Sequence, residues 1–355
     1  MHGTTEDHRP GSFHVPNLLG TAMEMERKSV RLGISRCLMG EQVRYDGGHK
    51  HASFLVDALR AYVEWVPVCP EVEAGLGVPR EPMQLMGSPE HPRLVTVHSR
   101  RDYTARMQHV TARCVRELDA LDLAGYIFKK GSPSCGLHQV GVYDWQGNVT
   151  GTGTGLFART IRRHFALLPV EEDIHLRELT HREHFFERVW GYRRWKDFLH
   201  RQPITYARLA AFHARNYCLL LVHHHKQCRR LGAMLAQADR WPLHVLAQRY
   251  GVLFMEALSV KPTRRQHARL LRRLGTVFQA DLSSADRTRL LDVLHEYEQR
   301  RVPLLVPILL VRRYARRLGL RVVQAQTYLD PFPKRLAFLG SRTGDCDRKG
   351  ENLLQ

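Results

Sequence analysis

The sequence predicts an α/β domain with a parallel, Rossmann-like sheet, followed by an all-α helical domain. From residue 30 to about 168, short apolar runs alternate with stretches of helical spacing, which is the pattern of parallel strands joined by helices. After residue 203 only helical spacing continues. The charge divides at a similar place. Residues 1–200 hold 26 Lys and Arg against 24 Asp and Glu (net +2), and residues 201–355 hold 28 against 11 (net +17), which indicates two domains with different partners.

Three strands and two helices are expected between residues 30 and 130. Strands are predicted at "VRLGIS" (30–35), in "EWVPVCPEV" (64–72) and in "LAGYIFKK" (123–130), with helices over 51–63 and 102–122. In a parallel sheet, ligands bind just beyond the carboxyl ends of the strands. A cysteine follows each predicted strand, namely Cys37, Cys69 and Cys135. We therefore expect the three thiols to meet at one edge of the sheet, where they can bind one metal centre.

Cys135 lies in "FKKGSPSCGLHQVG" (128–141), among Ser, Pro and Gly residues that favour an open turn over a core. For Cys114, which lies in a helical pattern, and for Cys218 and Cys228, ten residues apart in one predicted helix, we expect packing roles. Cys346 lies in a polar tail. The chain has no CxxC pair, and its odd count of seven cysteines indicates reduced thiols rather than a disulfide framework.

The stretch 138–165 predicts a strand, a turn and then a helix whose start is rich in glycine. Gly151, Gly153 and Gly155 could bind a phosphate group through backbone amides at the helix N-terminus. The alternative is a tight turn with close packing.

The second half of the chain predicts a linker with helices over 169–202 and a basic, all-helical domain over 203–338. Prolines lie near the expected helix boundaries, at Pro203, Pro242, Pro262 and Pro303, whereas Pro307 either begins or kinks the last long helix. His213, His223 and His267 could meet across helices, with ordinary packing as the alternative. The charge favours an anionic partner such as RNA, a nucleotide or an acidic protein, and an arginine-rich composition that only serves solubility is the alternative.

Both ends of the chain are polar. We expect residues 1–29 to form a disordered leader, with Met1, Met23 or Met25 as the start, and residues 339–355 to form a disordered tail. No apolar run is long enough to cross a bilayer, and the N-terminal stretch lacks the apolar segment of a secretory signal. The expectation is a cytoplasmic protein without a membrane contact.

Three segments together resemble the thiouracil desulfurase family, also catalogued as domain of unknown function 523. They are "RLGISRCLMGEQVRYDGGHK", "VPVCPEVEAGLGVPREP" and "KKGSPSCG", and the similarity runs from about residue 31 to 168. Residues 203–338 resemble a helical family, domain of unknown function 1722, through "HARNYCLLLVHHHK" (213–226), "PTRRQHARLL" (262–271), "VPLLVPILLVRRYAR" (302–316) and "QTYLDPFPKRL" (326–336). The second family brings no established activity.

The resemblance implies a [4Fe–4S] cluster bound by Cys37, Cys69 and Cys135, with the fourth iron free to bind the sulfur of a thiolated pyrimidine, either a base or a nucleotide. Water would then replace the sulfur without net redox change, and the sulfur would leave as hydrosulfide. The protein is thus expected to be an iron–sulfur-dependent desulfurase that hydrolyses a carbon–sulfur bond.

The same motifs suggest roles for polar residues around the cysteines. Glu71 is the candidate general base, and Ser132 or Ser134 could hydrogen-bond the substrate or the attacking water. The candidates for holding the pyrimidine or a phosphate are Arg44, Tyr45, Asp46 and Lys129. Each residue has a structural alternative: Glu71 could cap a helix or pair with Arg80, the serines could cap the turn, residues 44–50 could form only a turn, and Lys129 could end a strand in solvent.

Arg36 and Gly131 depart from the residues usual in the family at those positions, which leaves substrate choice less defined than cluster binding.

Two functions of other classes are also compatible with the sequence. A nucleic-acid-binding protein with a structural cluster or zinc would bind RNA or DNA with strong salt dependence and release no sulfide. A redox sensor would use the open cluster to respond to oxygen, and the helical domain would transmit the change.

Overall fold

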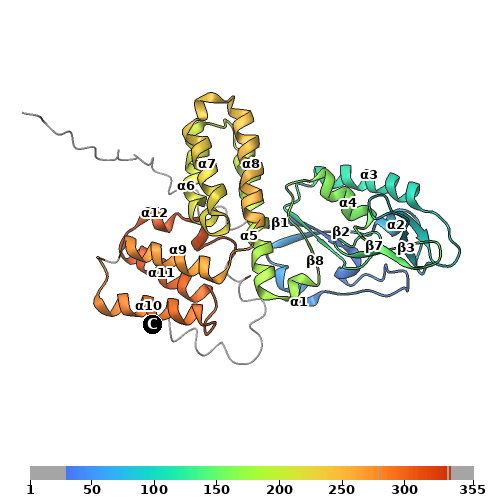
Figure 1. The fold of residues 1–355 in the computed structure, drawn as a ribbon, viewed down its shortest axis with the longest axis horizontal. Coiled ribbons are helices and arrows are strands. Elements are labelled where there is room, and N and C mark those ends of the chain that lie inside the picture. The colour runs from blue at the N-terminus through green and yellow to red at the C-terminus, as the bar shows by residue number, and fades with distance from the viewer. Residues whose placement is uncertain (1–28, 279, 334–335, 337–355) are drawn as a thin grey trace, which may run out of the picture.

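The computed structural model describes residues 29–278, 280–333 and 336 (Figure 1). Residues 1–28 of the expected leader, and the expected tail with Cys346, lie outside the described residues. Strands with covering helices form one part of the molecule, and a bundle of helices forms the other (Figure 1). The predicted fold class is confirmed. Within the described residues, no helix is both long and apolar enough to span a membrane.

The first sheet contains four parallel strands in the order β2-β1-β5-β8. Their bounds are Val63–Val68 for β2, Val30–Ser35 for β1, Gly125–Phe128 for β5 and Val170–Glu172 for β8. The three expected strands are therefore present and parallel. The fourth, β8, lies beyond residue 168, in the segment that the sequence assigned to a linker with helices, so the parallel sheet extends further along the chain than expected.

The centre of this sheet depends on one glycine. Tyr126 and Phe128 of β5 point to one face of the sheet, and Ile127 points to the other. The Tyr126 ring covers Gly33 of β1, where an added Cβ would lie 2.1 Å from the ring atom Cδ2. Any side chain at position 33 would displace the ring, so the "LGIS" segment of β1 needs its glycine for packing.

A second sheet has the strand order β4-β3-β6-β7. Its strands are β3 (Met83–Met86), β4 (Arg93–Thr96), β6 (Val140–Tyr143) and β7 (Val149–Gly153). β3 pairs with β6 in parallel, and the two outer pairs are antiparallel. β6 is the strand expected after Cys135, whereas β3 and β4 were not predicted.

Helices cover both faces of the first sheet. α3 (Thr104–Ala120) and α4 (Leu156–His164) pack on the face of Tyr126 and Phe128, in a core that also buries Cys114. α1 (Ser53–Leu59) and α5 (Leu179–His200) pack on the face of Ile127. Three shorter segments lie near the strand ends: η2 (Arg36–Met39), α2 (Pro70–Glu73) and η3 (His175–Arg177).

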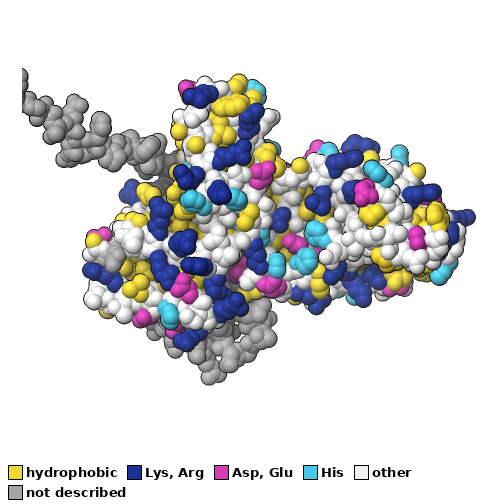
Figure 2. All heavy atoms as spheres, viewed as in Figure 1, with side chains coloured by type: hydrophobic (Ala, Val, Ile, Leu, Met, Phe, Trp, Pro, Cys, Tyr) yellow, Lys and Arg dark blue, Asp and Glu magenta, His cyan; other side chains and the backbone are white. Residues whose placement is uncertain are grey.

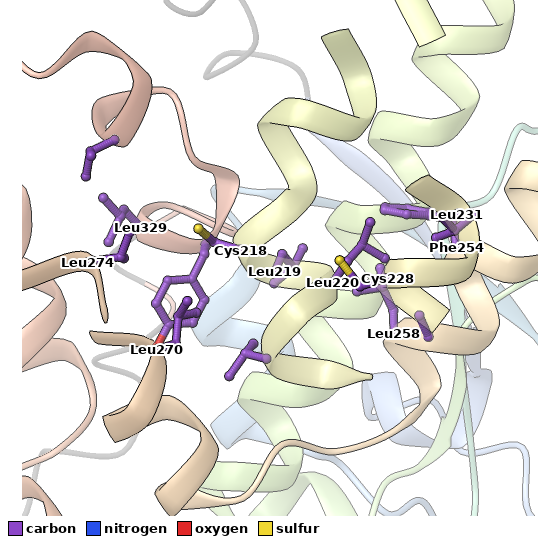
Figure 3. Packing of buried hydrophobic residues seen from close by; sticks show 14 of the residues in the cluster. Cys218, Leu219, Leu220, Cys228, Leu231, Phe254, Leu258, Leu270, Leu274 and Leu329 are labelled. Atoms are coloured by element: carbon purple, nitrogen blue, oxygen red, sulfur yellow. The ribbon is translucent and has the colours of Figure 1, made fainter. Parts of the chain in front are cut away.

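The second half of the chain is helical, as expected. Its helices are α6 (Tyr206–His223), α7 (His225–Ala236), η4 (Ala238–Arg240), α8 (Leu243–Ser259), α9 (Arg264–Val277), α10 (Ser284–Glu298), α11 (Leu305–Arg317), α12 (Arg321–Gln324) and η5 (Thr327–Leu329). Pro307 lies in the first turn of α11, where a missing amide hydrogen costs little, so it begins the helix rather than kinking it. Cys218 and Cys228 are buried among leucines in the core of this domain (Figure 3), which confirms their packing role.

α5 joins the two parts because it contributes to both cores. Phe185 and Phe186 near its beginning pack into the α/β core, and Trp195 and Phe198 near its end pack into the helical core. Phe332, after the last helix, returns to the α/β core and lies against Phe186, with ring centroids 6.1 Å apart.

Buried polar groups lie where α5 meets the helical domain. Glu187 of α5 has its Oε2 atom 3.1 Å from Nε2 of His223, at the end of α6, and the His223 Nδ1 atom hydrogen-bonds the Val260 carbonyl at 2.8 Å. His267 of α9 hydrogen-bonds the Tyr328 hydroxyl at 3.0 Å. Two of the three histidines considered from the sequence thus lie around one carboxylate, whereas His213 hydrogen-bonds Tyr250 instead.

Glu183, one turn before Glu187, gives the stability of this region a pH dependence. Burial, together with the Glu187 charge, raises the pKa of Glu183 from 4.5 to about 7. The pKa of Glu183 is higher in the folded protein than in the unfolded chain. The protonated carboxyl therefore makes its full contribution to the free energy of unfolding below about pH 4.5, and this contribution is lost as the pH rises through about 7.

We predict that Glu183→Gln becomes more stable relative to wild type by on the order of 2 kcal/mol between pH 4.5 and 8. Urea unfolding of both proteins at the two pH values measures this, and an equal difference at both would contradict it.

Candidate active site

The carboxyl ends of the parallel strands bring two of the cysteines together. β1 and β2 pair in register up to Ser35 and Val68. Cys69 follows β2 directly, and Cys37 lies two residues beyond β1, in η2. Both thiols therefore emerge from neighbouring strands at the same edge. This is the arrangement that the sequence predicted.

Cys135 reaches the same edge through a loop that follows β5. The hydroxyl of Ser132 accepts hydrogen bonds from the amides of Ser134 (3.2 Å) and Cys135 (3.1 Å), and the Ser132 carbonyl accepts one from Gly136 at 2.7 Å. Gly136 lies where an added Cβ would come within 2.4 Å of Val140 Cγ2. Ser132 therefore forms the turn that presents Cys135, as its structural alternative predicted.

The three thiols share one electrostatic environment. Burial raises the pKa of Cys37 to about 11, and the charge of Cys69 contributes to the rise. Burial raises the pKa of Cys135 well above its ordinary value, and Cys69 and Cys37 both contribute. The charge of Cys69 thus acts on both Cys37 and Cys135, and the charge of Cys37 acts on Cys135. A cation would be needed to hold all three as thiolates at neutral pH.

Cys69 begins the short helix α2. Burial raises its pKa, and the backbone amides of Val72 and Glu71 oppose this change by hydrogen bonding to the sulfur. The sulfur also lies 3.9 Å from the Val43 carbonyl oxygen. In the described part of the chain, no three side chains of His, Cys, Asp or Glu are arranged around a single metal ion.

Glu71 lies beside the cysteines and forms an ion pair with Arg80. Arg80 Nε donates to Glu71 Oε2 at 2.9 Å, and the Nη2 atom also contacts Oε2. Arg80 is held in turn by the carbonyls of Val43 (3.0 Å) and Gly77 (2.8 Å). The pairing with Arg80, one alternative for Glu71, is thus present, and it fixes the carboxylate where its charge raises the pKa of Cys135.

Residues 44–48 form a turn next to Cys37. Asp46 accepts hydrogen bonds from the Arg44 guanidinium and the Gly48 amide, and the Arg44 amide bonds the Gly48 carbonyl at 3.2 Å. The Tyr45 ring is 43% exposed and lies 5.3 Å from the Arg44 guanidinium carbon. Arg44 lowers the pKa of Cys37, which places this turn at the thiol site.

Lys129 does not end its strand in solvent. Its ammonium contacts both carboxylate oxygens of Asp173 at 3.0 Å, and the two side chains are 18% and 11% exposed. Asp173 also accepts a hydrogen bond from the Lys130 amide at 2.8 Å. Lys129 lowers the pKa of Cys37, so its charge lies at the site although an acidic partner holds it.

Three polar residues that support the candidate site were not considered from the sequence: Ser35, Glu172 and Asp173. The Ser35 hydroxyl accepts the Lys129 amide at 3.0 Å and hydrogen-bonds Cys135, which lowers the pKa of that thiol. Glu172, 1% exposed, accepts the amides of Leu137 (2.8 Å) and His138 (3.2 Å). For Glu172 and Asp173, the signal in the sequence was the acidic run "EED" (171–173), which follows the short apolar run "LLPV".

Gly151, Gly153 and Gly155 do not form the expected phosphate cradle. Gly151 and Gly153 belong to β7, and the Gly155 amide donates to the Gly136 carbonyl at 2.8 Å. The Ser134 carbonyl accepts hydrogen bonds from the amides of Phe157 and Ala158 at the start of α4. These amides are already used by the Cys135 loop, so the alternative, a tight turn with close packing, is the arrangement present.

Two polar groups beside the cysteines are buried and have no hydrogen-bond partner among the described residues. They are the hydroxyl of Ser134, which is 0% exposed, and the hydroxyl of Tyr126, whose pKa burial and the neighbouring cysteines raise. A buried hydroxyl without a partner costs about 1–3 kcal/mol. Such groups, together with three clustered thiols, fit a site completed by a bound group.

The first domain is therefore an α/β protein with a cysteine site at the carboxyl edge of a parallel sheet. Residues 32–173 match the profile of the 2-thiouracil desulfurase family and belong to that family. Residues 218–333 match the profile described as protein of unknown function (DUF1722). Both resemblances inferred from the motifs are thus confirmed.

Each of three individual relatives covers about two fifths of this chain. The uncharacterized protein YbbK of Bacillus subtilis (strain 168) is 28% identical over 141 residues, 37% of this chain and 88% of the relative. The uncharacterized protein YbgA of Escherichia coli (strain K12) is 24% identical over 132 residues, 37% of this chain and 78% of the relative. A solved structure described as the [4Fe–4S]-dependent thiouracil desulfidase TudS is 32% identical, covers 42% of this chain and 93% of its own, and has a TM-score of 0.35.

We predict that Glu172 holds Cys135 in position for metal binding. Glu172→Ala leaves the buried Leu137 amide without its acceptor, which costs about 1–3 kcal/mol, and also removes the bond to the His138 amide, so the loop is loosened. Glu172→Gln keeps a carbonyl oxygen and should restore the loop. After anaerobic reconstitution, the Ala variant should bind less than half the iron per chain that the Gln variant binds, at matched helix content by circular dichroism. Equal iron content in the two variants would contradict a positioning role.

Proposed function

We propose that this protein removes sulfur from a thiolated pyrimidine by hydrolysis and that it depends on a [4Fe–4S] cluster bound by Cys37, Cys69 and Cys135. The proposal is supported by the position of Cys37, Cys69 and Cys135 after parallel, neighbouring strands, in a domain that matches the profile of the 2-thiouracil desulfurase family. The solved desulfidase is described as dependent on the same cofactor.

The donor set fits such a cluster. When bound, a cluster with only three protein ligands leaves one iron open, which can bind the soft sulfur of the substrate and polarise the carbon–sulfur bond. The other described cysteines lie elsewhere: Cys114 in the core beneath α3, and Cys218 and Cys228 in the helical core. The unpartnered hydroxyls of Ser134 and Tyr126 would lie beside the bound group.

Glu71 would act as the general base. Arg80 binds Oε2 of Glu71, which leaves Oε1 to take a proton from the attacking water. The water oxygen forms a bond to the ring carbon, and the carbon–sulfur bond breaks with its electron pair going to sulfur. The second proton of the water passes to that sulfur, which leaves as hydrosulfide. No electron is gained or lost overall.

The remaining polar residues would bind the substrate. The exposed ring of Tyr45 can stack on a pyrimidine, and Arg44 and Asp46 hold the turn that carries it. Ser134 has a free hydroxyl to offer the ring or the water, and Ser132 holds the loop. Lys129, held by Asp173, would supply a positive charge near the departing sulfur.

The helical domain would recruit an anionic form of the substrate, such as a nucleotide or an RNA. Lys and Arg side chains are spread over much of the visible face of this domain (Figure 2). Basic side chains attract polyanions before the specific contacts form.

Free thiols at the site fit a reducing compartment, which supports the cytoplasm as the location.

The proposal predicts which cysteines carry the activity. Cys37→Ala, Cys69→Ala and Cys135→Ala should each abolish the visible absorption of the anaerobically reconstituted protein and its release of sulfide from thiouracil, because two thiolates do not hold the cluster. Cys114→Ala is the matched control and should keep both. Sulfide release by any of the first three variants at the wild-type rate would refute the ligand assignment.

The role of Glu71 has a separate test. Glu71→Gln keeps an oxygen for Arg80 but cannot take a proton, so it should retain the cluster absorption and lose about 10²–10⁴-fold in the rate of sulfide release. Single-turnover sulfide release on cluster-loaded protein measures this rate. A loss of less than fivefold would show that another group activates the water.

A further inference from the structure

Three arginines line a pocket on α4 that the proposed chemistry does not use. The pocket has a volume of about 280 Å³ and is lined by Thr154, Arg159, Arg162 and Arg163. It is a shallow hollow that is largely open to solvent. It lies on the α/β domain, at the helix that follows the Cys135 loop (Figure 1).

The three guanidinium groups form no ion pair at contact distance within the described residues, although the Arg159 charge helps to lower the pKa of the nearby Glu90 carboxyl. Arg159 donates to the backbone carbonyls of Glu90 (2.6 Å) and Pro89 (3.0 Å), which fix its position without neutralising its charge. The nearby Glu90 carboxylate contacts Ser88 instead. Arg162 and Arg163 are exposed and form no ion pair in this part of the chain. Three like charges that converge on one pocket repel one another until an anion binds.

The pocket is tied to the Cys135 loop. Thr154 donates its hydroxyl hydrogen to the Leu137 carbonyl at 3.1 Å, two residues beyond Cys135. The next residue, Gly155, donates its amide to the Gly136 carbonyl at 2.8 Å. A ligand in the pocket would therefore contact the segment that supports Cys135 from its outer side.

We propose that Thr154, Arg159, Arg162 and Arg163 bind the phosphate group of a nucleotide. Guanidinium groups match phosphate oxygens in pairs, and a phosphate monoester carries close to two negative charges at neutral pH, which suits a site with three positive ones. The volume leaves room for part of the attached sugar. The backbone amides of α4 take no part, because the Cys135 loop already uses them. The assignment concerns binding alone and does not depend on desulfuration.

The test is isothermal titration calorimetry of the full-length protein with uridine monophosphate, uridine and inorganic phosphate as probes. Uridine monophosphate should bind at least tenfold more tightly than uridine or phosphate alone. The double variant R162A/R163A should weaken this binding at least tenfold. Arg60→Ala is the control, since Arg60 is an exposed arginine at the end of α1, on the opposite face of the sheet.

Three outcomes would overturn the assignment. If uridine and its monophosphate bound equally tightly, the phosphate group would make no contact with the site. If inorganic phosphate and the nucleotide bound equally tightly, the site would bind a free anion and not a nucleotide. An equal loss of binding in Arg60→Ala and R162A/R163A would show a general charge effect. Because binding is measured without turnover, a failure here leaves the desulfurase proposal untouched, and a failure of sulfide release leaves this one untouched.

Discussion

The parallel pairing of β2, β1 and β5 is the constraint on which the candidate site depends. Cys37, Cys69 and Cys135 are far apart along the chain, and only the shared direction of these strands brings their thiols to one edge. The close contact between Gly33 and Tyr126 holds the two central strands at the required spacing. A change that shifted this pairing would move the cysteines as well as the core.

The loop that carries Cys135 is held from several sides. Glu172 binds its amides from β8, the start of α4 binds the Ser134 carbonyl, and Gly136 and Gly155 allow the close approach of the two backbones. Most polar groups of the loop are thus satisfied by the protein. The Ser134 hydroxyl has no hydrogen-bond partner among the described residues, which fits a site for a bound group.

α5 links this site to the helical domain. Phe185 and Phe186 lie in the core beneath the sheet, and Trp195 and Phe198 lie in the helical core. A helix that belongs to two cores restricts the relative motion of the domains, because moving one domain would expose apolar surface in the other. The basic domain is therefore positioned by packing and not only by a flexible connection.

The sequence was sufficient for the fold class and for the position of the cysteines, because apolar periodicity and turn chemistry are local signals. It was insufficient for β8, whose three residues give too short a pattern to separate from a linker, and for β3 and β4, which form their own sheet. The role of Glu172 depends on amides 34 and 35 residues away, so no local pattern reveals it. The glycines at 151, 153 and 155 were misjudged because the first two pair with β6 and the Gly155 amide binds a loop that only the fold brings near.

Mössbauer spectroscopy of the anaerobically reconstituted protein, loaded with isotopically enriched iron, tests the central claim most directly. The account predicts one iron whose signal differs from the others and changes when thiouracil is added, because that iron lacks a protein ligand. Four irons with equivalent signals that do not respond to thiouracil would contradict it, since no open iron would then be available to the substrate.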